Sequence, residues 1–509
     1  MTFEIVFVLL SLLGMVAALI ADKMRPGMIL FSVVVLFLCA GILTPKEMLE
    51  GFSNKGMITV ALLFLVSEGI RQSGTLGQVI KKLLPQGKTT VFKAQLRILP
   101  SVAFISAFLN NTPVVVIFAP IIKHWAKSVN LPATKFLIPL SYVTILGGIC
   151  TLIGTSTNLV VHGMILEAGF EGFSMFELGK VGVFIAIAGI IYIFLFSKRL
   201  LPDARPDTAV PDEEIEEGEK FHRVEAVLGA RFPGINKKLK DFNFQRHYGA
   251  EVKEIKTRNG QRFVTNLDDV VLHEGDTLVV MADDTFIPTW GESSVFVLLT
   301  NGNEPDTSGK KKRWFALLLL VLMIVGATVG ELPVTKEMFP DIKLDMFFFV
   351  SITTIIMAWT NLFPARKYTK YISWDILITI ACAFAISKAM VNSGVADSVA
   401  KFIIGLSDDY GPHVLLAMVF IITNLFTELI TNNAAAALAF PLALSISAQL
   451  GVSPTPFFVV ICMAASASFS TPIGYQTNLI VQGIGNYKFT DFVRIGLPLN
   501  IITFLISVI

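Results

Sequence analysis

The chain has 509 residues, of which 53% are hydrophobic and 16% are charged. A soluble protein of this size carries about 25% charged residues, so the composition excludes an ordinary soluble protein and predicts a polytopic membrane protein. The net charge of +2 does not point to a nucleic-acid partner. The four cysteines show no CxxC spacing, which favours buried thiols over disulfides or a metal site.

Apolar stretches follow one another along most of the chain. They lie at 3–20, 28–43, 57–67, 136–149, 179–197, 314–330, 344–360, 374–387, 413–427, 457–468 and 496–509. Several approach the roughly 20 residues that span a bilayer, and the shorter ones suit broken or re-entrant helices. The first stretch has neither a basic start nor a small-residue cleavage site, so we expect it to remain as a helix and not to be a signal peptide.

One polar region interrupts this pattern. Residues 203–310 contain most of the acidic charge, and alternating segments predict strands at 249–255, 276–282 and 294–300. We therefore predict a small α/β domain at 221–301. Basic clusters at 197–199 and 310–313 flank it. Because Lys and Arg favour cytoplasmic loops, we expect residues 200–312 in the cytoplasm and both chain termini outside.

Two short phrases occur twice in the apolar sequence. The segment IGTSTNLVVHG at 153–163 matches IGYQTNLIVQG at 473–483 in seven of eleven positions, with an offset of 320. The segment LNNTPVVVIFAP at 109–120 matches ITNNAAAALAFP at 430–441, with an offset of 321. The matching phrases predict that the two halves of the membrane sequence form a structural repeat.

Charge placement indicates that the two halves are inverted. The stretch 71–97 is basic and contains no acid, whereas its counterpart at 388–413 contains three aspartates. Equivalent segments are therefore expected on opposite sides of the membrane. We predict a polytopic α-helical membrane protein with two inverted repeats, at 1–200 and 312–509, and a cytoplasmic domain inserted between them.

Each repeat has two polar interruptions. The first is an Asn-rich tip, at 110–112 and 431–433, and the second is a Gly/Thr-rich break, at 147–158 and 466–478. Non-helical backbone at membrane depth survives only around a protein-lined cavity. Helix N termini there favour an anion, and unwound carbonyls can bind Na⁺. Alternatively, Asn, Thr and Gly in such segments only tune helix packing; the two matched pairs favour a binding site with re-entrant hairpins and broken helices.

Three charged residues stand inside or beside the apolar segments, namely Glu68, Lys388 and Glu428. Charge within a membrane is costly and is often functional. Because all three lie near predicted helix ends, snorkelling or ion pairing remains an alternative to a proton relay.

The paired NNTP and TNNA tips, each followed by an apolar run and a proline, resemble those of the divalent anion/sodium symporters, and TPIGYQTNL resembles the sulfate-permease branch that carries a cytoplasmic insert. The resemblance implies a homodimer in the lipid bilayer, an elevator-type movement and Na⁺ as the coupling ion. It implies a sodium site at Asn110, Asn111, Gly154, Thr155 and Asn158, and a second at Thr431, Asn432, Gly474, Thr477 and Asn478. The substrate anion would lie between the tips, bound by Asn111, Thr112, Thr157, Asn432, Asn433 and Thr477.

This sequence departs from the carboxylate transporters at the residues expected to set selectivity. The tips read Asn-Asn-Thr and Thr-Asn-Asn where those relatives typically begin with Ser, and the breaks carry STN and QTN instead of proline-rich forms. The departures favour sulfate over a di- or tricarboxylate as the substrate.

The inserted segment resembles the C-terminal domain of RCK proteins (regulators of potassium conductance). The residues that carry this resemblance are 232–244, 249–260 and 270–284. The resemblance implies either a regulator site at 221–301, of the nucleotide type, or a structural and dimerising role. No glycine-rich nucleotide fingerprint is present in this segment.

Two other transport functions were weighed against a sodium-coupled symporter. A cation/proton antiporter would use Glu68 and Glu428, but clear pairs of carboxylates in mid-membrane are missing. A K⁺ channel would need a filter such as TVGYG, which the sequence lacks. The membrane halves contain no HExxH, GxSxG or Walker motif, so we do not expect an enzyme. We expect a multi-pass transporter in the plasma membrane, which in a bacterium is the inner membrane.

Overall fold

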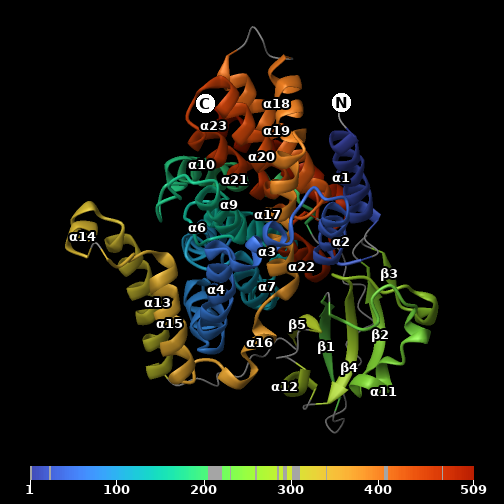
Figure 1. Cartoon of the computed structure of the whole chain (residues 1–509). Helices are drawn as coiled ribbons and strands as arrows, with labels where there is room; N and C mark the ends of the chain where they lie inside the picture. The colour runs from blue at the N-terminus through green and yellow to red at the C-terminus, as the bar shows by residue number, and fades with distance from the viewer. Residues whose placement is uncertain are drawn as a thin grey trace.

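The protein consists of a large helical body with a small β-sheet domain at one end (Figure 1). The computed structural model describes residues 3–21, 24–203, 221–229, 231–257, 261–283, 286–290, 295–300, 310–339, 341–405, 411–472 and 474–509. Both chain ends lie at the end of the helical body away from the sheet (Figure 1).

The described residues before the sheet form ten α-helices. They are α1 (Phe3–Ala21), α2 (Pro26–Cys39), α3 (Pro45–Glu50), α4 (Lys55–Gln72), α5 (Thr75–Leu83), α6 (Val91–Ser106), α7 (Asn111–Ser128), α8 (Leu137–Gly148), α9 (Ser156–Glu167) and α10 (Gly179–Leu200). Short 3-10 turns lie at Gly51–Ser53 and Ala133–Lys135.

The described residues after the sheet form eleven α-helices. They are α13 (Lys310–Gly330), α14 (Pro333–Met338), α15 (Met346–Trp359), α16 (Tyr368–Tyr371), α17 (Trp374–Asn392), α18 (Val395–Gly405), α19 (Pro412–Leu429), α20 (Asn432–Leu450), α21 (Thr455–Ser466), α22 (Gln476–Gly485) and α23 (Phe489–Val508). A 3-10 turn lies at Ala365–Lys367. The order of long and short helices from α4 to α10 recurs from α17 to α23.

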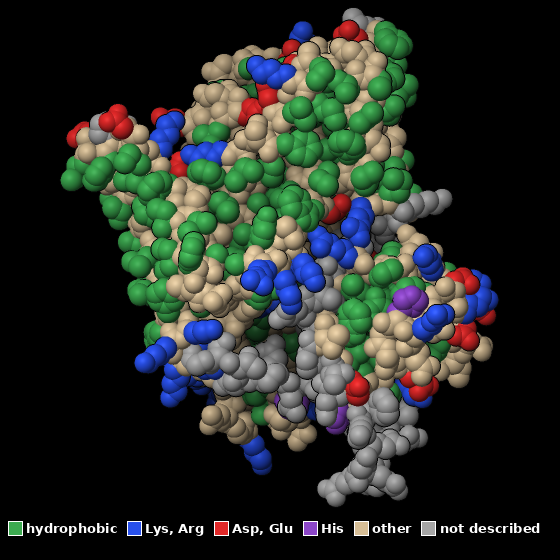
Figure 2. Space-filling view, turned by 60° about the horizontal axis from the view of Figure 1, so that its bottom comes forward, with side chains coloured by type: hydrophobic (Ala, Val, Ile, Leu, Met, Phe, Trp, Pro, Cys, Tyr) green, Lys and Arg blue, Asp and Glu red, His purple; other side chains and the backbone are tan. Residues whose placement is uncertain are grey.

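The helical body has the lengths and surfaces of a membrane protein, which confirms the polytopic helical fold expected from composition. Within the described residues, eight helices are long and apolar enough to cross a bilayer. Large apolar side chains on their outer faces are more than half exposed, as at Leu10, Phe184, Leu195, Leu318 and Leu322. Figure 2 shows hydrophobic side chains over most of this body and basic ones close to its boundary with the sheet domain. Such continuous apolar surface matches contact with lipid.

The two helical segments are interleaved rather than side by side. Helix α7 packs against α22, α9 against α20, α10 against α23, α4 against α15, and α2 against α17. Each pair joins one helix from before the sheet to one from after it. The most deeply buried helices are α8, all of whose 12 residues are buried, α21 with 9 of 12 and α20 with 14 of 19.

The sheet domain is antiparallel with strand order β3-β2-β4-β1-β5. Its elements are β1 (Phe221–Leu228), α11 (Phe244–Tyr248), β2 (Glu251–Lys256), β3 (Arg262–Phe263), β4 (Thr277–Asp283), α12 (Phe286–Trp290) and β5 (Phe296–Thr300), with 3-10 turns at Leu239–Asp241 and Leu267–Asp269. The register pairs Val224 with Val280 and Ile255 with Leu278. Phe232, Tyr248 and Phe296 stack together in its core.

The polar breaks are shorter than the sequence predicted. Helix α8 continues to Gly148 and α9 begins at Ser156, so non-helical backbone covers only 149–155 of the predicted 147–158. Helix α21 ends at Ser466 and α22 begins at Gln476. Four expected members of the breaks, Thr157, Asn158, Thr477 and Asn478, therefore lie in the first turn of a helix. The N-capping residues Thr155 and Tyr475 are extended, and helical geometry resumes directly after them.

Candidate functional site

Four helices begin next to one another in the middle of the helical body. Their N-capping residues are Asn110 for α7, Thr155 for α9, Thr431 for α20 and Tyr475 for α22, and none of these side chains caps its own helix. Some other helices are capped by a side chain, as at the start of α4, where Asn54 Oδ1 accepts from Gly56 N at 2.7 Å, whereas α8 and α10 are not. The four central N termini thus leave their capping side chains for other partners.

Tyr475 lies at the centre of this meeting point. Its hydroxyl contacts Thr155 Oγ1 at 2.9 Å and the side-chain amide of Asn111 at 2.7 Å. The ring is only 7% exposed. One hydroxyl therefore joins the starts of α7, α9 and α22.

Asn111 is enclosed by the first break. In the amide orientation that satisfies all its partners, Nδ2 donates to Thr144 O at 3.0 Å, Gly154 O at 3.3 Å and Ser106 Oγ at 2.8 Å, while Oδ1 accepts from Tyr475. The side chain is 1% exposed. Asn111 thus holds the first tip against the first break by hydrogen bonds alone.

The second tip reaches the first break in a similar way. Asn432 Nδ2 donates to Thr157 Oγ1 at 2.8 Å, and Thr157 Oγ1 donates to Asn433 Oδ1 at 3.2 Å. Ser156 Oγ also donates to Asn433 Oδ1, at 3.3 Å. The first tip meets the second break through Thr112, whose hydroxyl donates to Gln476 Oε1 at 3.3 Å.

Two asparagines stabilise the breaks with the same pair of bonds. Asn158 Nδ2 donates to Gly148 O at 3.3 Å and Thr151 O at 2.9 Å. Asn478 Nδ2 donates to Ser468 O at 2.8 Å and Thr471 O at 3.2 Å. In each case the acceptors stand ten and seven residues earlier, so carbonyls released by the broken helix are paired again.

The glycine in each break allows close backbone approach. A Cβ added at Gly154 would lie 2.5 Å from Gly148 O, and one added at Gly474 would lie 1.9 Å from Ser468 Oγ and 2.4 Å from Thr427 O. Neither position tolerates a side chain without a shift of its surroundings.

Near the tips, Asn158 Oδ1 and Thr431 Oγ1 are buried without a hydrogen-bond partner among the described residues. Both residues are among those predicted to bind sodium. A buried acceptor without a partner is costly, and a cation would satisfy it. Within the described residues no group of three or more His, Cys, Asp or Glu side chains is placed to hold a metal ion, so a cation at either tip would be held mainly by neutral oxygens.

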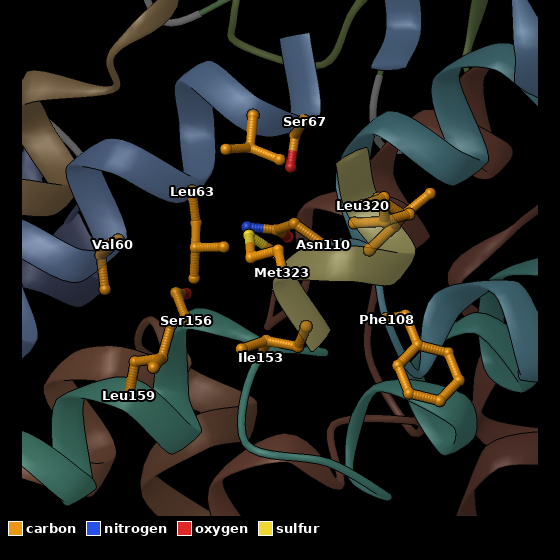
Figure 3. Close-up of a pocket in the computed structure, with 12 residues that line it drawn as sticks. Val60, Leu63, Ser67, Phe108, Asn110, Ile153, Ser156, Leu159, Leu320 and Met323 are labelled. Atoms are coloured by element: carbon orange, nitrogen blue, oxygen red, sulfur yellow. The ribbon is translucent and has the colours of Figure 1, made fainter. Parts of the chain in front are cut away.

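A small pocket of about 10 Å³, the room of roughly one water molecule, adjoins the first tip. Figure 3 shows Asn110 extending into it between helix α4, which contributes Leu63 and Ser67, and helix α13, which contributes Leu320 and Met323. Ser156 lines the pocket from the start of α9. Apolar walls with a few polar groups are typical of small-ligand sites.

The predicted substrate residues differ in accessibility. Asn111, Thr157 and Thr477 are buried, and Thr477 Oγ1 accepts from Ser141 Oγ at 2.9 Å. The pocket presents Asn110 and Ser156 instead. The structure therefore brings the predicted residues together in one cluster, with Thr477 and Asn478 turned toward α8.

The three charged residues flagged in the sequence have different surroundings. Glu428 lies at the second tip, where Oε1 accepts from Ser470 N at 3.0 Å and from Asn500 Nδ2 at 2.7 Å. Glu68 instead pairs with Arg71 at 2.7 Å, and Lys388 is exposed on α17. Of the three, only Glu428 is hydrogen-bonded to a polar break.

Sequence reasoning missed Tyr475, Ser106 and Ser141 as members of the cluster. The mismatch between Thr155-Ser156 and Tyr475-Gln476 in the repeated phrase marked the position of the tyrosine, but not its partners. Ser106 and Ser141 stand in apolar stretches and carry no signal in the sequence.

The buried helical body, the interleaved halves and the mostly neutral cluster at four helix ends define a multi-pass membrane transporter. The family model for citrate transporters (CitMHS) matches residues 16–449 and 338–509. The chain belongs to this family.

Individual proteins that match this chain also bear the names of transporters. The chain is 30% identical over 556 aligned positions to an uncharacterized transporter of Synechocystis sp., covering 92% of this chain and 90% of that protein. It is 31% identical over 281 positions to sodium/sulfate cotransporter 2 of Chlamydomonas reinhardtii, covering 55% of this chain and 31% of that protein. The crystal structure of the YdaH transporter of Alcanivorax borkumensis shares the fold, with a TM-score of 0.52 at 12% identity over 91% of this chain and 86% of that one.

Proposed function

We propose that the protein is a sodium-coupled symporter of a small divalent anion, with sulfate as the first candidate. The observation that carries this proposal is the convergence of four helix N termini on one cluster of mostly neutral side chains, with the Glu428 carboxylate at its edge. Each N terminus is equivalent to about half an elementary charge, so the four together supply about two positive charges without a basic side chain. That charge matches a divalent anion.

The anion would bind beside the first tip once the pocket there widens, because its present volume of about 10 Å³ is the room of roughly one water molecule. Asn110 and Ser156 offer donors there, and Ser156 is linked to Asn433 of the second tip. The residues predicted from the resemblance, Asn111, Thr112, Thr157, Asn432, Asn433 and Thr477, would position these donors or reach the anion when the tips rearrange.

Sodium would bind on the inner side of each tip. The unpartnered oxygens of Asn158 and Thr431 fit a cation, and the relative that bears the name sodium/sulfate cotransporter is in keeping with this ion. Asn110, Asn111, Gly154 and Thr155 would complete the first site. Asn432, Gly474, Thr477 and Asn478 would complete the second.

The reciprocal hydrogen bonds support an inverted repeat. Thr155 and Tyr475, which contact one another, are equivalent positions at an offset of 320; residues of a two-fold repeat that touch their own equivalents lie near its axis. We propose that residues 1–200 and 312–509 form such repeats and move by an elevator-type mechanism in a homodimer. The multi-pass chain would lie in the plasma membrane of a bacterium with both termini outside and residues 200–312 in the cytoplasm.

Two alternatives remain within this framework. A di- or tricarboxylate is favoured by the family's citrate-transporter description. A cation/proton antiporter is favoured by Glu428, a carboxylate bonded to the second break.

Uptake of radiolabelled sulfate, succinate and citrate by proteoliposomes, with Na⁺ or K⁺ outside, tests the proposal. We expect sulfate uptake that requires Na⁺ and is abolished by Asn111→Ala and Asn432→Ala. Proton-driven cation exchange without any anion flux would contradict it. Sodium-dependent uptake of succinate or citrate alone would retain the mechanism and change the substrate.

A further inference from the structure

The sheet domain touches the helical body on helices that begin at the candidate site. Lys123, on α7, pairs with Glu225 of β1, its Nζ lying 3.0 Å from both carboxylate oxygens. On α22, a Cβ added at Gly483 would lie 2.4 Å from Thr277 Oγ1, so the start of β4 rests directly on this helix. The turn before β4 packs on Leu479, 3.5 Å from a Cβ added at Gly275.

Helices α7 and α22 connect these contacts to the central cluster. Helix α7 runs from Asn111 to Lys123 in about 18 Å at 1.5 Å per residue, and α22 begins at Gln476. The two helices pack against each other and are joined at their starts by the bond from Asn111 to Tyr475. A contact that holds the C-terminal ends of α7 and α22 in place therefore also restrains their N termini, where Asn111 and Tyr475 lie.

The sheet domain also contacts a helix outside this pair. Arg231 Nη2 donates to Ile372 O at 3.3 Å, just before α17. The domain thus bridges α7 and α22 to a different part of the body, and such a bridge opposes relative movement between them.

The bridge combines a favourable charge pair with an unsatisfied polar group. Burial raises the pKa of Glu225, but Lys123, Lys256 and Arg223 outweigh it and hold the pKa at about 2. At the α22 contact, Thr277 Oγ1 is buried without a hydrogen-bond partner among the described residues. An unsatisfied buried group disfavours the docked arrangement, so the ion pair opposes a tendency to separate.

We propose that the sheet domain is a clamp on the transport core: docked on α7 and α22 it holds the conformation described here, and its release permits the transport movement. The proposal rests on the proposed transport function. It assigns Lys123 and Glu225 as positioning residues and requires no ligand on the sheet domain.

A disulfide tests the clamp directly. The Cβ positions of residues 277 and 483 are 3.8 Å apart, the mean separation in natural disulfides. Thr277→Cys and Gly483→Cys are placed in a chain whose four native cysteines are replaced by alanine. We expect oxidation to lower anion uptake by proteoliposomes at least tenfold and a reducing agent to restore it. Failure of the bond to form, or unchanged uptake by the cross-linked protein, would overturn the proposal.

A second measurement needs no substrate, so it separates failure of the clamp from failure of the transport function. Asn110→Cys, in the pocket, is labelled with a maleimide, with and without Glu225→Gln. We expect Glu225→Gln to change the labelling rate at least threefold. Lys240→Ala is the matched control, because it breaks the pair with Asp269 (2.8 Å) in the sheet domain and should leave the rate unchanged. Equal effects of the two variants would refute the clamp even if no anion is transported.

Discussion

Replacing Tyr475 with phenylalanine removes one hydroxyl from the centre of the site and leaves its ring in place. The hydroxyl bonds Asn111 at 2.7 Å and Thr155 at 2.9 Å, and these partners are 1% and 2% exposed. A typical hydrogen bond contributes about 0.5–1.5 kcal/mol net, so we expect the variant to lose about 1–3 kcal/mol of stability. The freed Asn111 amide should also weaken anion or Na⁺ binding roughly tenfold, which corresponds to about 1.4 kcal/mol.

A double-mutant cycle isolates the bond between the two breaks. Tyr475→Phe, Thr155→Val and the double variant are compared by thermal unfolding in detergent and by half-saturating Na⁺ and sulfate concentrations. We expect a coupling energy of about 0.5–1.5 kcal/mol, because each substitution removes the same bond. Additivity within about 0.3–0.5 kcal/mol would show that the two residues do not interact.

The matched control for this substitution is Tyr192→Phe. Tyr192 is similarly buried at 8% exposure, and its hydroxyl donates to Ile495 O at 3.1 Å, between α10 and α23. Loss of this bond should lower the unfolding temperature and leave both half-saturating concentrations unchanged. A similar loss of affinity in the two variants would mean that Tyr475 acts only through general stability.

Three further outcomes follow from contacts in the structure. Gly154→Ala forces a Cβ to within 2.5 Å of a backbone oxygen and should abolish uptake. Gly405→Ala, whose Cβ would meet no described residue within 4 Å, should be silent in the same assay. The amide oxygen of Glu428→Gln can still accept from Ser470 N, so this variant should retain uptake but require a higher Na⁺ concentration. Glu68→Gln should leave the required Na⁺ concentration unchanged. Complete loss of flux in Glu428→Gln alone would favour antiport. The pKa of Glu225 is lowered from 4.5 to about 2. Its contribution to folding stability is therefore complete above about pH 4.5 and is lost as the pH falls toward 2. Between these pH values the unfolding temperature of Glu225→Gln should change less than that of the wild type.

The membrane character and the general location of the site could be predicted because they depend on local patterns. Long apolar stretches specify helices whatever their partners, and Asn, Thr and Gly at membrane depth mark interrupted helices. The prediction that the tips at 110–112 and 431–433 belong with the two Gly/Thr breaks needed only the repeated phrases. In the structure, residues of both tips hydrogen-bond to residues at the starts of α9 and α22.

The hydrogen-bond partners of the site residues could not be predicted in the same way. Asn111 and Tyr475 are 364 residues apart, and no periodicity connects a tyrosine in the second break to one asparagine of the first tip. The helix starts were also misplaced, because Thr157 and Asn158 look like loop residues in sequence. The hydrogen bonds from Asn158 Nδ2 to Gly148 O and Thr151 O pair the free carbonyls of the first break. These contacts let α9 begin at Ser156, earlier than the sequence predicted.

The two halves share a backbone scaffold and differ in the side chains placed on it. Thr151 Oγ1 donates to Ala107 O, and Thr471 Oγ1 donates to Glu428 O at 3.2 Å, so the same bond joins tip and break in both halves. At that shared position one half carries a methyl group and the other a carboxylate. The Glu428 carboxylate accepts from Ser470 N at 3.0 Å and from Asn500 Nδ2 at 2.7 Å, so it is bonded directly to the second break. The second break therefore has a carboxylate among its hydrogen-bond acceptors where the first break has none at the equivalent position, Ala107.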